Sequence, residues 1–235
     1  MIQRIDVAFR KEDVELSDFG AVAVIDTLRA TTTMTMILDQ GGMAIRPVAD
    51  LEEAYAIKAH DPGVLLGGER ENRPPEGFDG GNSPRDWPRS RVAGRRIVFT
   101  TTNGTAAIER VRSVPRLVLA ALVNAEACGR YLWQLERPTL LVASGTRGAT
   151  SLEDVLACGA VASVWPRSSR TDAAEVACAL FERERHRLAQ CLGEGTHGQN
   201  LAAQGLSQDL AFCGQLNITR VIPVLCQDGW LRGTD

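Results

Sequence analysis

The stretch AVAVIDTLRATTT, residues 21–33, decides the fold class. Its first five residues form an unbroken apolar run, as expected for a strand that is covered on both faces. Small hydroxyl-bearing residues follow, and the pattern then predicts a helix over residues 32–40 that the glycine pair at 41–42 ends. A buried strand that leads directly into a helix is typical of parallel α/β proteins.

The same alternation continues along the chain. Further strands are predicted at residues 44–48, 64–66, 96–100, 117–122, 139–143 and 221–225. Further helices are predicted at 50–60, 104–111, 125–135, 152–164, 172–191 and 199–214. Two helix starts carry a capping-box pattern, Asp50 with Glu53 and Ser151 with Asp154.

These elements predict an α/β fold with a mainly parallel sheet and helices on both faces. The sequence shows no strong repeat and no clear linker, so we expect a single unit over residues 1–235. An alternative within that unit is a pair of α/β halves around a shared cleft, at about 1–120 and 121–235.

Residues 67–94 interrupt the alternation. They are rich in glycine and proline, and a loop of this length is uncommon in a compact domain and often functional. Disorder is the alternative interpretation. Phe78 and Trp87 favour an ordered loop, because both carry apolar surface that folding can bury.

The composition is that of an ordinary globular protein. Hydrophobic residues make up 44% of the chain and charged residues 23%, and the net charge is −3, so the basic character of a nucleic-acid-binding protein is missing. No apolar run reaches the roughly 18 residues of a membrane span, and residues 1–10 lack a signal-peptide pattern. The six cysteines form no Cys-x-x-Cys pair, which disfavours zinc and indicates reduced, buried thiols in a cytoplasmic protein.

Three predicted strands end in similar segments: DTLRATTT at 26–33, TTNGT at 101–105 and SGTRGATS at 144–151. Each leads through small hydroxyl or glycine residues into a helix, whose first N–H groups are free to bind an anion. Helix capping alone explains any one of them. Together with Arg29 and Arg147, they predict a site for a small anion with more than one charged group. We expect that site at the shared carboxyl edge of the sheet.

Acidic residues near these segments suit a divalent cation. Asp26 ends an apolar strand, where a carboxylate needs a metal, an arginine or backbone donors as a partner. An ion pair with Arg29 is the alternative to a metal. Further carboxylates follow at Glu69, Asp79, Glu153 and Asp154, the last two at a helix start, where capping alone is an alternative. Oxygen ligands of this kind favour Mg²⁺.

Several known phosphatase motifs are absent from the sequence. An aspartyl-phosphate enzyme of the haloacid dehalogenase type needs a second aspartate two residues after the first, and Leu28 occupies that position. The chain also lacks the cysteine-phosphatase loop, an Arg-His-Gly motif and a P-loop. Among the three histidines, only His197, within GTHG at 195–198, lies in a segment that suits a site, and a plain loop is the alternative.

Longer motifs around the strand ends resemble those of the 2-phosphosulfolactate phosphatase family. In the order of that family, they are IDTLRATTT at 25–33, LGGER at 66–70, PEGFD at 75–79, GNSP at 81–84, TTTNGT at 100–105, SGTRG at 144–148 and SLED at 151–154. The resemblance spans roughly residues 21–160, and 205–213 resembles the family's closing helix less specifically. One departure is GQN at 198–200, where family members tend to carry Gly-Arg.

The resemblance implies a Mg²⁺-dependent hydrolase that removes phosphate from 2-phosphosulfolactate, a small anionic phosphoester and coenzyme M precursor. That substrate carries a phosphate, a carboxylate and a sulfonate, which agrees with the multiply charged anion expected from the strand ends. A phosphatase for another small phosphorylated hydroxyacid and a non-catalytic binder of anionic metabolites are the alternatives. A homodimer is expected only because such assemblies are common.

The site hypothesis assigns roles to particular residues. We predict catalytic roles for Asp26, Arg29, Asn103 and Asp154, and Mg²⁺ ligands among Asp26, Glu69, Asp79 and Asp154. Predicted substrate-binding residues are Thr31, Thr32, Gly104, Thr105, Ser144, Gly145, Thr146, Arg147 and Gly148, with Arg147 on the carboxylate or sulfonate. Water activated by the metal or by a carboxylate attacks phosphorus, and direct attack by Asp26 is the alternative.

Overall fold

In the computed structural model, which describes residues 3–234, strand β2 (Ala21–Ile25) lies inside a group of four parallel strands. Its neighbours are β6 (Leu117–Ala120) and β7 (Thr139–Ala143), and β1 (Ile5–Ala8) pairs with β7 at the edge of the sheet. Every residue of β2 is buried, as the apolar run predicts.

A second parallel group contains β3 (Ala44–Pro47), β5 (Arg96–Thr100) and β4 (Leu65–Gly68). The antiparallel hairpin of β8 (Ile222–Leu225) and β9 (Leu231–Thr234) lies between the groups. The complete order is β1-β7-β2-β6-β8-β9-β3-β5-β4. The hairpin joins each group through a single residue pair, Val118 with Val224 and Ile45 with Leu231.

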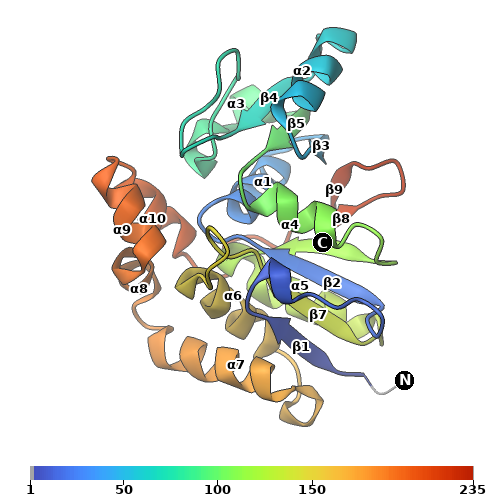
Figure 1. Cartoon of the computed structure of the whole chain (residues 1–235), viewed down its shortest axis with the longest axis vertical. Helices are drawn as coiled ribbons and strands as arrows, with labels where there is room; N and C mark the ends of the chain where they lie inside the picture. Colours follow the sequence, from blue (N-terminus) through green and yellow to red (C-terminus); the bar gives the residue numbers. More distant parts are fainter. Residues whose placement is uncertain (1–2, 235) are drawn as a thin grey trace.

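The carboxyl ends of the two parallel groups face each other. Three antiparallel pairings separate β6 from β3, so a flat sheet would turn these ends to opposite edges. Instead, Gly104 after β5 lies so close to Asp26 after β2 that a Cβ on Gly104 would be 2.8 Å from the Asp26 Oδ2. The sheet therefore turns strongly across its sparse central pairings. Figure 1 shows β1, β2 and β7 in the lower part and β3, β4 and β5 in the upper part.

The α/β fold with a mainly parallel sheet is confirmed. The expectation that all three strand ends share one carboxyl edge is wrong, because β5 belongs to the group that runs the other way. Strands from both predicted halves also mix in one sheet, since β1 and β2 pair with β7.

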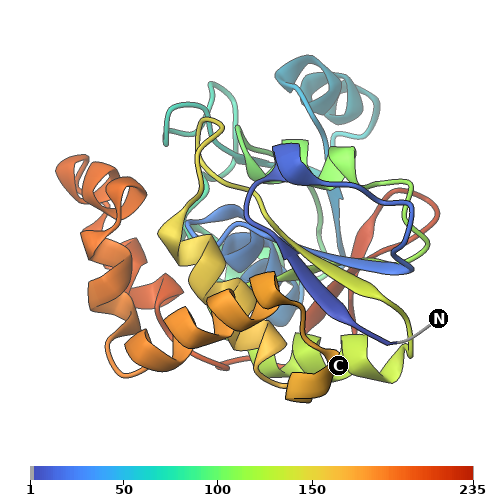
Figure 2. The same ribbon diagram turned by 60° about the horizontal axis from the view of Figure 1, so that its bottom comes forward.

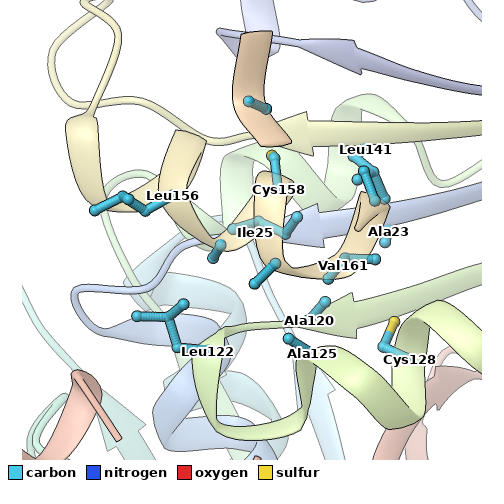
Figure 3. Close-up of a cluster of buried hydrophobic side chains, with 14 of the residues drawn as sticks. Ala23, Ile25, Ala120, Leu122, Ala125, Cys128, Leu141, Leu156, Cys158 and Val161 are labelled. Atoms are coloured by element: carbon cyan, nitrogen blue, oxygen red, sulfur yellow. The ribbon is translucent and has the colours of Figure 1, made fainter. Parts of the chain in front are cut away.

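Helices cover both faces of the β2 group. On one face, α1 (Ala30–Asp39) and α4 (Gly104–Arg110) pack against the side chains of Val22 and Val24. On the other face, Ala23 and Ile25 contact a core that includes α5 (Ala125–Gln134) and α6 (Leu152–Ala162), as Figure 3 shows. Helix α7 (Asp172–Glu184) lies against α6 (Figure 2).

The segment at 67–94 is ordered. It contains a 3₁₀ turn, η2 (Pro84–Asp86), and the short helix α3 (Arg89–Val92). Trp87 is 1% exposed and its indole N–H donates to the carbonyl of Gly81 at 3.0 Å. Phe78 packs against the small core beneath α2 (Leu51–His60). Both aromatic residues therefore pack into the protein, as predicted.

The C-terminal helices are shorter than predicted. Residues 172–191 and 199–214 form α7, α8 (Leu188–Glu194), α9 (Thr196–Ala203) and α10 (Ser207–Cys213) in place of two continuous helices. Figure 1 shows α8, α9 and α10 as an arm beside the sheet. The strand predicted to reach residue 122 ends at 120, where the 3₁₀ turn η3 (Leu122–Asn124) follows. Two further 3₁₀ turns are η1 (Lys11–Asp13) and η4 (Arg167–Ser169).

One of the two capping patterns forms as predicted. The Asp50 carboxylate accepts the N–H of Glu53 at 2.8 Å. The pattern at Ser151 is wrong, because that hydroxyl bonds to the hydroxyl of Thr146 at 2.8 Å. All six cysteines are free thiols and all but Cys226 are buried. Within residues 3–234, none of the helices combines the length and the apolar composition needed to cross a membrane.

Candidate active site

A cavity of about 660 Å³ lies where the ends of β2, β4, β5 and β7 meet the arm of α8 and α9. This volume is typical of a small-molecule site. The segments after β2, β5 and β7 contribute Asp26, Asn103 and Arg147, so all three predicted strand ends reach one cavity. The strong turn of the sheet brings them together, since β5 runs opposite to the other two.

Asp26 occupies the meeting point of these segments. Its carboxylate is 7% exposed and accepts the N–H of Ala30 at 3.1 Å, which anchors it to the first turn of α1. Gly104 packs against its other oxygen. Burial raises the pKa of Asp26, and Glu69 adds to this, while the Ala30 N–H and His197 act in the opposite sense.

Glu153 is the second buried carboxylate that lines the cavity. It is 2% exposed and stands in the first turn of α6. Burial is the largest cause of its raised pKa; the nearby Asp26 raises it further and His197 lowers it. Its backbone carbonyl accepts the hydroxyl of Thr27 at 3.2 Å, which links α6 to the segment after β2.

Asp154, the next residue, does not line the cavity. Its carboxylate accepts the N–H of Thr27 at 2.8 Å and the N–H of Gly145 at 3.1 Å. Burial first, then Glu153 and Asp26, keep the pKa of Asp154 well above its ordinary value. Asp154 therefore holds the segments after β2 and β7 together.

Glu69 both lines the cavity and links two segments of the chain. Its two oxygens accept the N–H groups of Thr102 and Asn72, each at 2.9 Å, which joins the segment after β4 to the segment after β5. The residue also lines the cavity. A carboxylate has further lone pairs when each oxygen accepts one hydrogen bond, so these contacts leave Glu69 able to bind a cation.

Arg29 does not line the cavity. Its guanidinium is 2% exposed and lies 2.7 Å from the carboxylate of Asp209 on α10. The hydroxyl of Ser83 donates to the same carboxylate at 2.6 Å. The ion pair considered between Arg29 and Asp26 is thus replaced by one between Arg29 and Asp209.

All the predicted site residues divide into two sets. Those that line the cavity are Asp26, Glu69, Asn103, Thr146 and Arg147. Those that lie outside its lining are Arg29, Thr31, Thr32, Asp79, Gly104, Thr105, Ser144, Gly145, Gly148 and Asp154.

Hydrogen bonds and one ion pair explain why several predicted residues lie outside the cavity lining. The hydroxyls of Thr31 and Thr32 donate to the carbonyls of Asp26 and Thr27, each at 2.9 Å. The Asp79 carboxylate accepts the N–H of Leu66 at 2.8 Å and lies 3.7 Å from Lys58. These side chains therefore bond to the backbone of β4 and of the segment after β2.

Three further residues line the cavity although the sequence assigned them no role: Glu153 and His197, which were only considered as candidates, and Asn82. His197 stands on α9, and its ring Nε2 lies 2.9 Å from the carbonyl oxygen of Leu28. Because a carbonyl oxygen only accepts, this nitrogen carries the proton. In the sequence, only the neighbouring glycines at 195 and 198 indicated that His197 could belong to a site.

Comparison with known proteins identifies the family. The family model described as 2-phosphosulpholactate phosphatase matches residues 8–228. The chain belongs to this family. A protein from Symbiobacterium thermophilum, named probable 2-phosphosulfolactate phosphatase, is 41% identical, over 88% of this chain and 92% of its own length. One with the same name from Pseudothermotoga lettingae is 36% identical, over 97% of this chain and 98% of its own length.

The match to the 2-phosphosulfolactate phosphatase family confirms the resemblance found in the strand-end motifs. It also extends that resemblance, because residues 8–228 include the arm of α8, α9 and α10 as well as residues 21–160. Proteins of this family are named as phosphatases, that is, phosphoric monoester hydrolases.

The charges of this phosphatase cavity suit a cation. The basic side chains in its lining are Arg147 and His197. Its five carboxylates are those of Asp26, Glu69, Glu71, Glu153 and Glu194. Among residues 3–234 no group of three His, Cys, Asp or Glu side chains is arranged to hold a metal ion. Mg²⁺ needs fewer, since it binds through one or two carboxylates together with waters and phosphate oxygens. The carboxylates around Asp26 therefore fit Mg²⁺.

Proposed function

We propose that this chain hydrolyses 2-phosphosulfolactate to sulfolactate and inorganic phosphate, and that it requires Mg²⁺. Membership of the family and the names of its relatives support the substrate. The observation that carries the proposal is the cavity itself, where the buried Asp26 carboxylate lies among the ends of β2, β5 and β7 and Arg147 lines the same space. This arrangement suits a phosphoester that carries further anionic groups.

Asp26 and Glu69 are the proposed Mg²⁺ ligands. Both line the cavity, and the charge of Glu69 acts on Asp26. When bound, Mg²⁺ supplies Lewis-acid stabilisation of charge on the phosphoryl oxygens. Asp79 and Asp154 contribute no ligand in this proposal, because neither lines the cavity.

The chain's own residues bind and orient the substrate. Asn103 donates its side-chain amide N–H to a phosphoryl oxygen, and Arg147 binds the carboxylate or sulfonate through its guanidinium. Glu153 is positioned to take a proton from the attacking water, because its buried carboxylate faces the cavity and has a raised pKa. His197 holds the segment after Asp26 through the carbonyl of Leu28.

A phosphate-release assay tests this function. Purified protein is offered 2-phosphosulfolactate and, in parallel, phospholactate and phosphoglycolate, each with Mg²⁺ and with EDTA. We expect release from 2-phosphosulfolactate that EDTA abolishes and added Mg²⁺ restores. No release from any of the three would leave a non-catalytic binder as the better proposal, and preference for an ester without sulfonate would change the substrate.

Mass spectrometry can separate the two chemical routes. Direct attack by Asp26 forms an aspartyl phosphate that adds one phosphoryl group to the protein, whereas attack by water does not. Mass spectrometry of Glu153→Gln protein, quenched during turnover, is expected to find unmodified protein. A phosphorylated Asp26 would establish the covalent route.

The proposed cellular context is coenzyme M synthesis in the cytoplasm. The free thiols support this location, because disulfides are uncommon in reducing compartments. Growth of a gene-deletion strain with and without coenzyme M would test the pathway.

A further inference from the structure

Asn82 lines the cavity beside the segment that carries Asp26, and its side chain has an unused hydrogen-bonding group. The residue is 6% exposed, and it comes from the long segment between β4 and β5. Within residues 3–234, no group donates a hydrogen bond to its buried oxygen Oδ1. Buried polar groups in native proteins nearly always have a partner, so this one needs an explanation.

The backbone around Asn82 is held firmly. Its carbonyl accepts the hydroxyl of Thr33 on α1 at 2.8 Å. On one side, the Gly81 N–H donates to Asp86 at 2.9 Å, and on the other, Ser83 donates to Asp209 at 2.6 Å. Hydrogen bonds of the Asn82 backbone and of its two neighbours therefore fix the residue at the cavity wall. The side-chain amide of Asn82 takes no part in them.

The direction of the amide follows from its chemistry. The oxygen and the N–H₂ group of an amide point apart, so an oxygen shielded by protein turns the N–H₂ group away from that side. Since Asn82 lines the cavity, that group is available to a ligand there. An amide N–H is a neutral donor, and it can approach an anionic oxygen without a second positive charge.

The contact with Thr33 links Asn82 to the helix that follows Asp26. Helix α1 begins immediately after the Asp26 segment, and the Asp26 carboxylate is itself anchored to Ala30 on α1. Asn82 and Asp26 are thus held by the same helix. Arg147 lines the cavity from another segment, the one after β7.

We propose that Asn82 is a phosphoryl-binding residue whose amide N–H₂ donates to an oxygen of the phosphoester beside Asp26. The inference rests on the proposed phosphatase function and adds a residue to its substrate site. An unpaired buried oxygen destabilises the ligand-free protein, so the presence of asparagine at this position is explained by binding and not by folding.

The experiment compares ligand binding with stability in the same variants. Asn82→Leu keeps the approximate size of the side chain and removes both polar ends, and Asn82→Asp replaces the N–H₂ donor with a negative oxygen. Ser83→Ala is the matched control, since it disturbs the neighbouring bond to Asp209 without changing the cavity lining. Calorimetric titration with inorganic phosphate in Mg²⁺ buffer gives the affinity, and thermal unfolding without phosphate gives the Tm.

We expect both Asn82 variants to bind phosphate at least about tenfold more weakly than the unsubstituted protein, with Asn82→Asp the weaker. Asn82→Leu should keep or raise the ligand-free Tm, whereas Ser83→Ala should lower the Tm and leave phosphate affinity within about twofold. Unchanged phosphate affinity in both Asn82 variants would overturn the proposal, and so would a lower Tm in Asn82→Leu with unchanged affinity. If Asn82→Leu fails to fold, Asn82→Asp alone decides.

The outcome is separable from the proposed function. Release of phosphate from 2-phosphosulfolactate by the unsubstituted protein tests the function, while the phosphate titration tests Asn82. A protein that binds phosphate through Asn82 but hydrolyses no phosphoester would refute the enzyme and support the binding residue.

Discussion

The guanidinium of Arg29 and the carboxylate of Asp209 form an ion pair at 2.7 Å, although 180 residues separate them in the sequence. Both side chains are almost fully enclosed, at 2% and 3% exposure. The pair ties the start of α1 to α10, and Ser83 donates to the same carboxylate at 2.6 Å. An arginine that the sequence suggested for anion binding thus connects the arm to the sheet.

Breaking this pair should destabilise the fold. Asp209→Ala leaves a buried guanidinium without a counter-charge, for which we expect a loss of about 3–5 kcal/mol in the free energy of unfolding. The double variant Arg29→Met with Asp209→Ala should recover part of that loss, because both charges are gone. Urea denaturation of the singles and the double measures the coupling.

An exposed ion pair on α5 provides the control for this cycle. Arg130 and Glu126 are 68% and 50% exposed and 2.7 Å apart, so Glu126→Ala should cost less than about 1 kcal/mol. If Asp209→Ala costs no more than Glu126→Ala, the buried pair has no special role in holding the arm.

Gly104 should be intolerant of a side chain. A Cβ atom there would lie 2.6 Å from the Cβ of Ala30 and 2.8 Å from the Asp26 Oδ2, so Gly104→Ala must displace the carboxylate or α1. We expect phosphate release to fall by about 10²-fold, because displacing a catalytic group by about 1 Å costs roughly that much. Steady-state kinetics and the Tm of the purified variant provide the check.

Gly193 on α8 is the matched control for that substitution. A Cβ at Gly193 would meet only Leu210, at an ordinary 3.6 Å, and Gly193→Ala should stabilise the helix by about 0.5–1 kcal/mol. Activity retained by Gly104→Ala would mean that the Asp26 position is less constrained than its contacts indicate.

The fold was predictable where local signals are strong. Buried strands such as β2 and β7 are continuous apolar runs, and the loops after them carry glycine and hydroxyl residues. Strand β9 was missed because its residues 231–234 include an exposed arginine and a glycine, which resemble a loop. The sequence also could not predict that the carboxyl ends of the two parallel groups face each other. That arrangement depends on the pairings of β8 and β9 with strands that are distant in sequence.

In the candidate site, too, local motifs indicated some residues and only tertiary contacts identify the others. Asp26, Asn103 and Arg147 follow predicted strands, so motif and position together indicated them. Adjacent residues on α6 could not be told apart, because neighbours on a helix point about 100° away from each other and only tertiary contacts decide which faces the cavity. Glu153 lines it, whereas Asp154 bonds to the backbone of Thr27.

Arg147 should contribute to substrate binding more than to the chemical step. It is exposed, lines the cavity and has a positive φ of 53° between two turn glycines, Gly145 and Gly148. Arg147→Lys keeps the charge but loses the planar fork that binds a carboxylate or sulfonate through two hydrogen bonds. We expect KM for 2-phosphosulfolactate to rise about tenfold with kcat nearly unchanged.

Inorganic phosphate distinguishes this role from that of Asn82. Because Arg147 is proposed to contact the carboxylate or sulfonate, Arg147→Lys should leave phosphate affinity within about twofold. A parallel loss of phosphate affinity would show that Arg147 binds the phosphoryl group instead.

The buried carboxylates predict how stability changes with pH in the absence of divalent cations. Burial raises the pKa values of Asp26, Glu153 and Asp154 in the folded protein, so folding favours their protonated forms. The resulting stability is fully present below the ordinary carboxyl pKa of about 4 and is lost as the pH rises through the raised values. The free energy of unfolding in EDTA should therefore decrease from about pH 4 upwards.

Glu153→Gln should make this decrease shallower, because one buried carboxylate no longer has to ionise in the folded state. The exposed Glu52→Gln on α2 is the control and should leave the slope as it is. Added Mg²⁺ should restore stability more at pH 8 than at pH 5, since it is proposed to bind the ionised carboxylates. Urea denaturation across this range, with EDTA and with Mg²⁺, gives all three comparisons. A slope that neither Mg²⁺ nor Glu153→Gln alters would place the responsible groups outside the cavity.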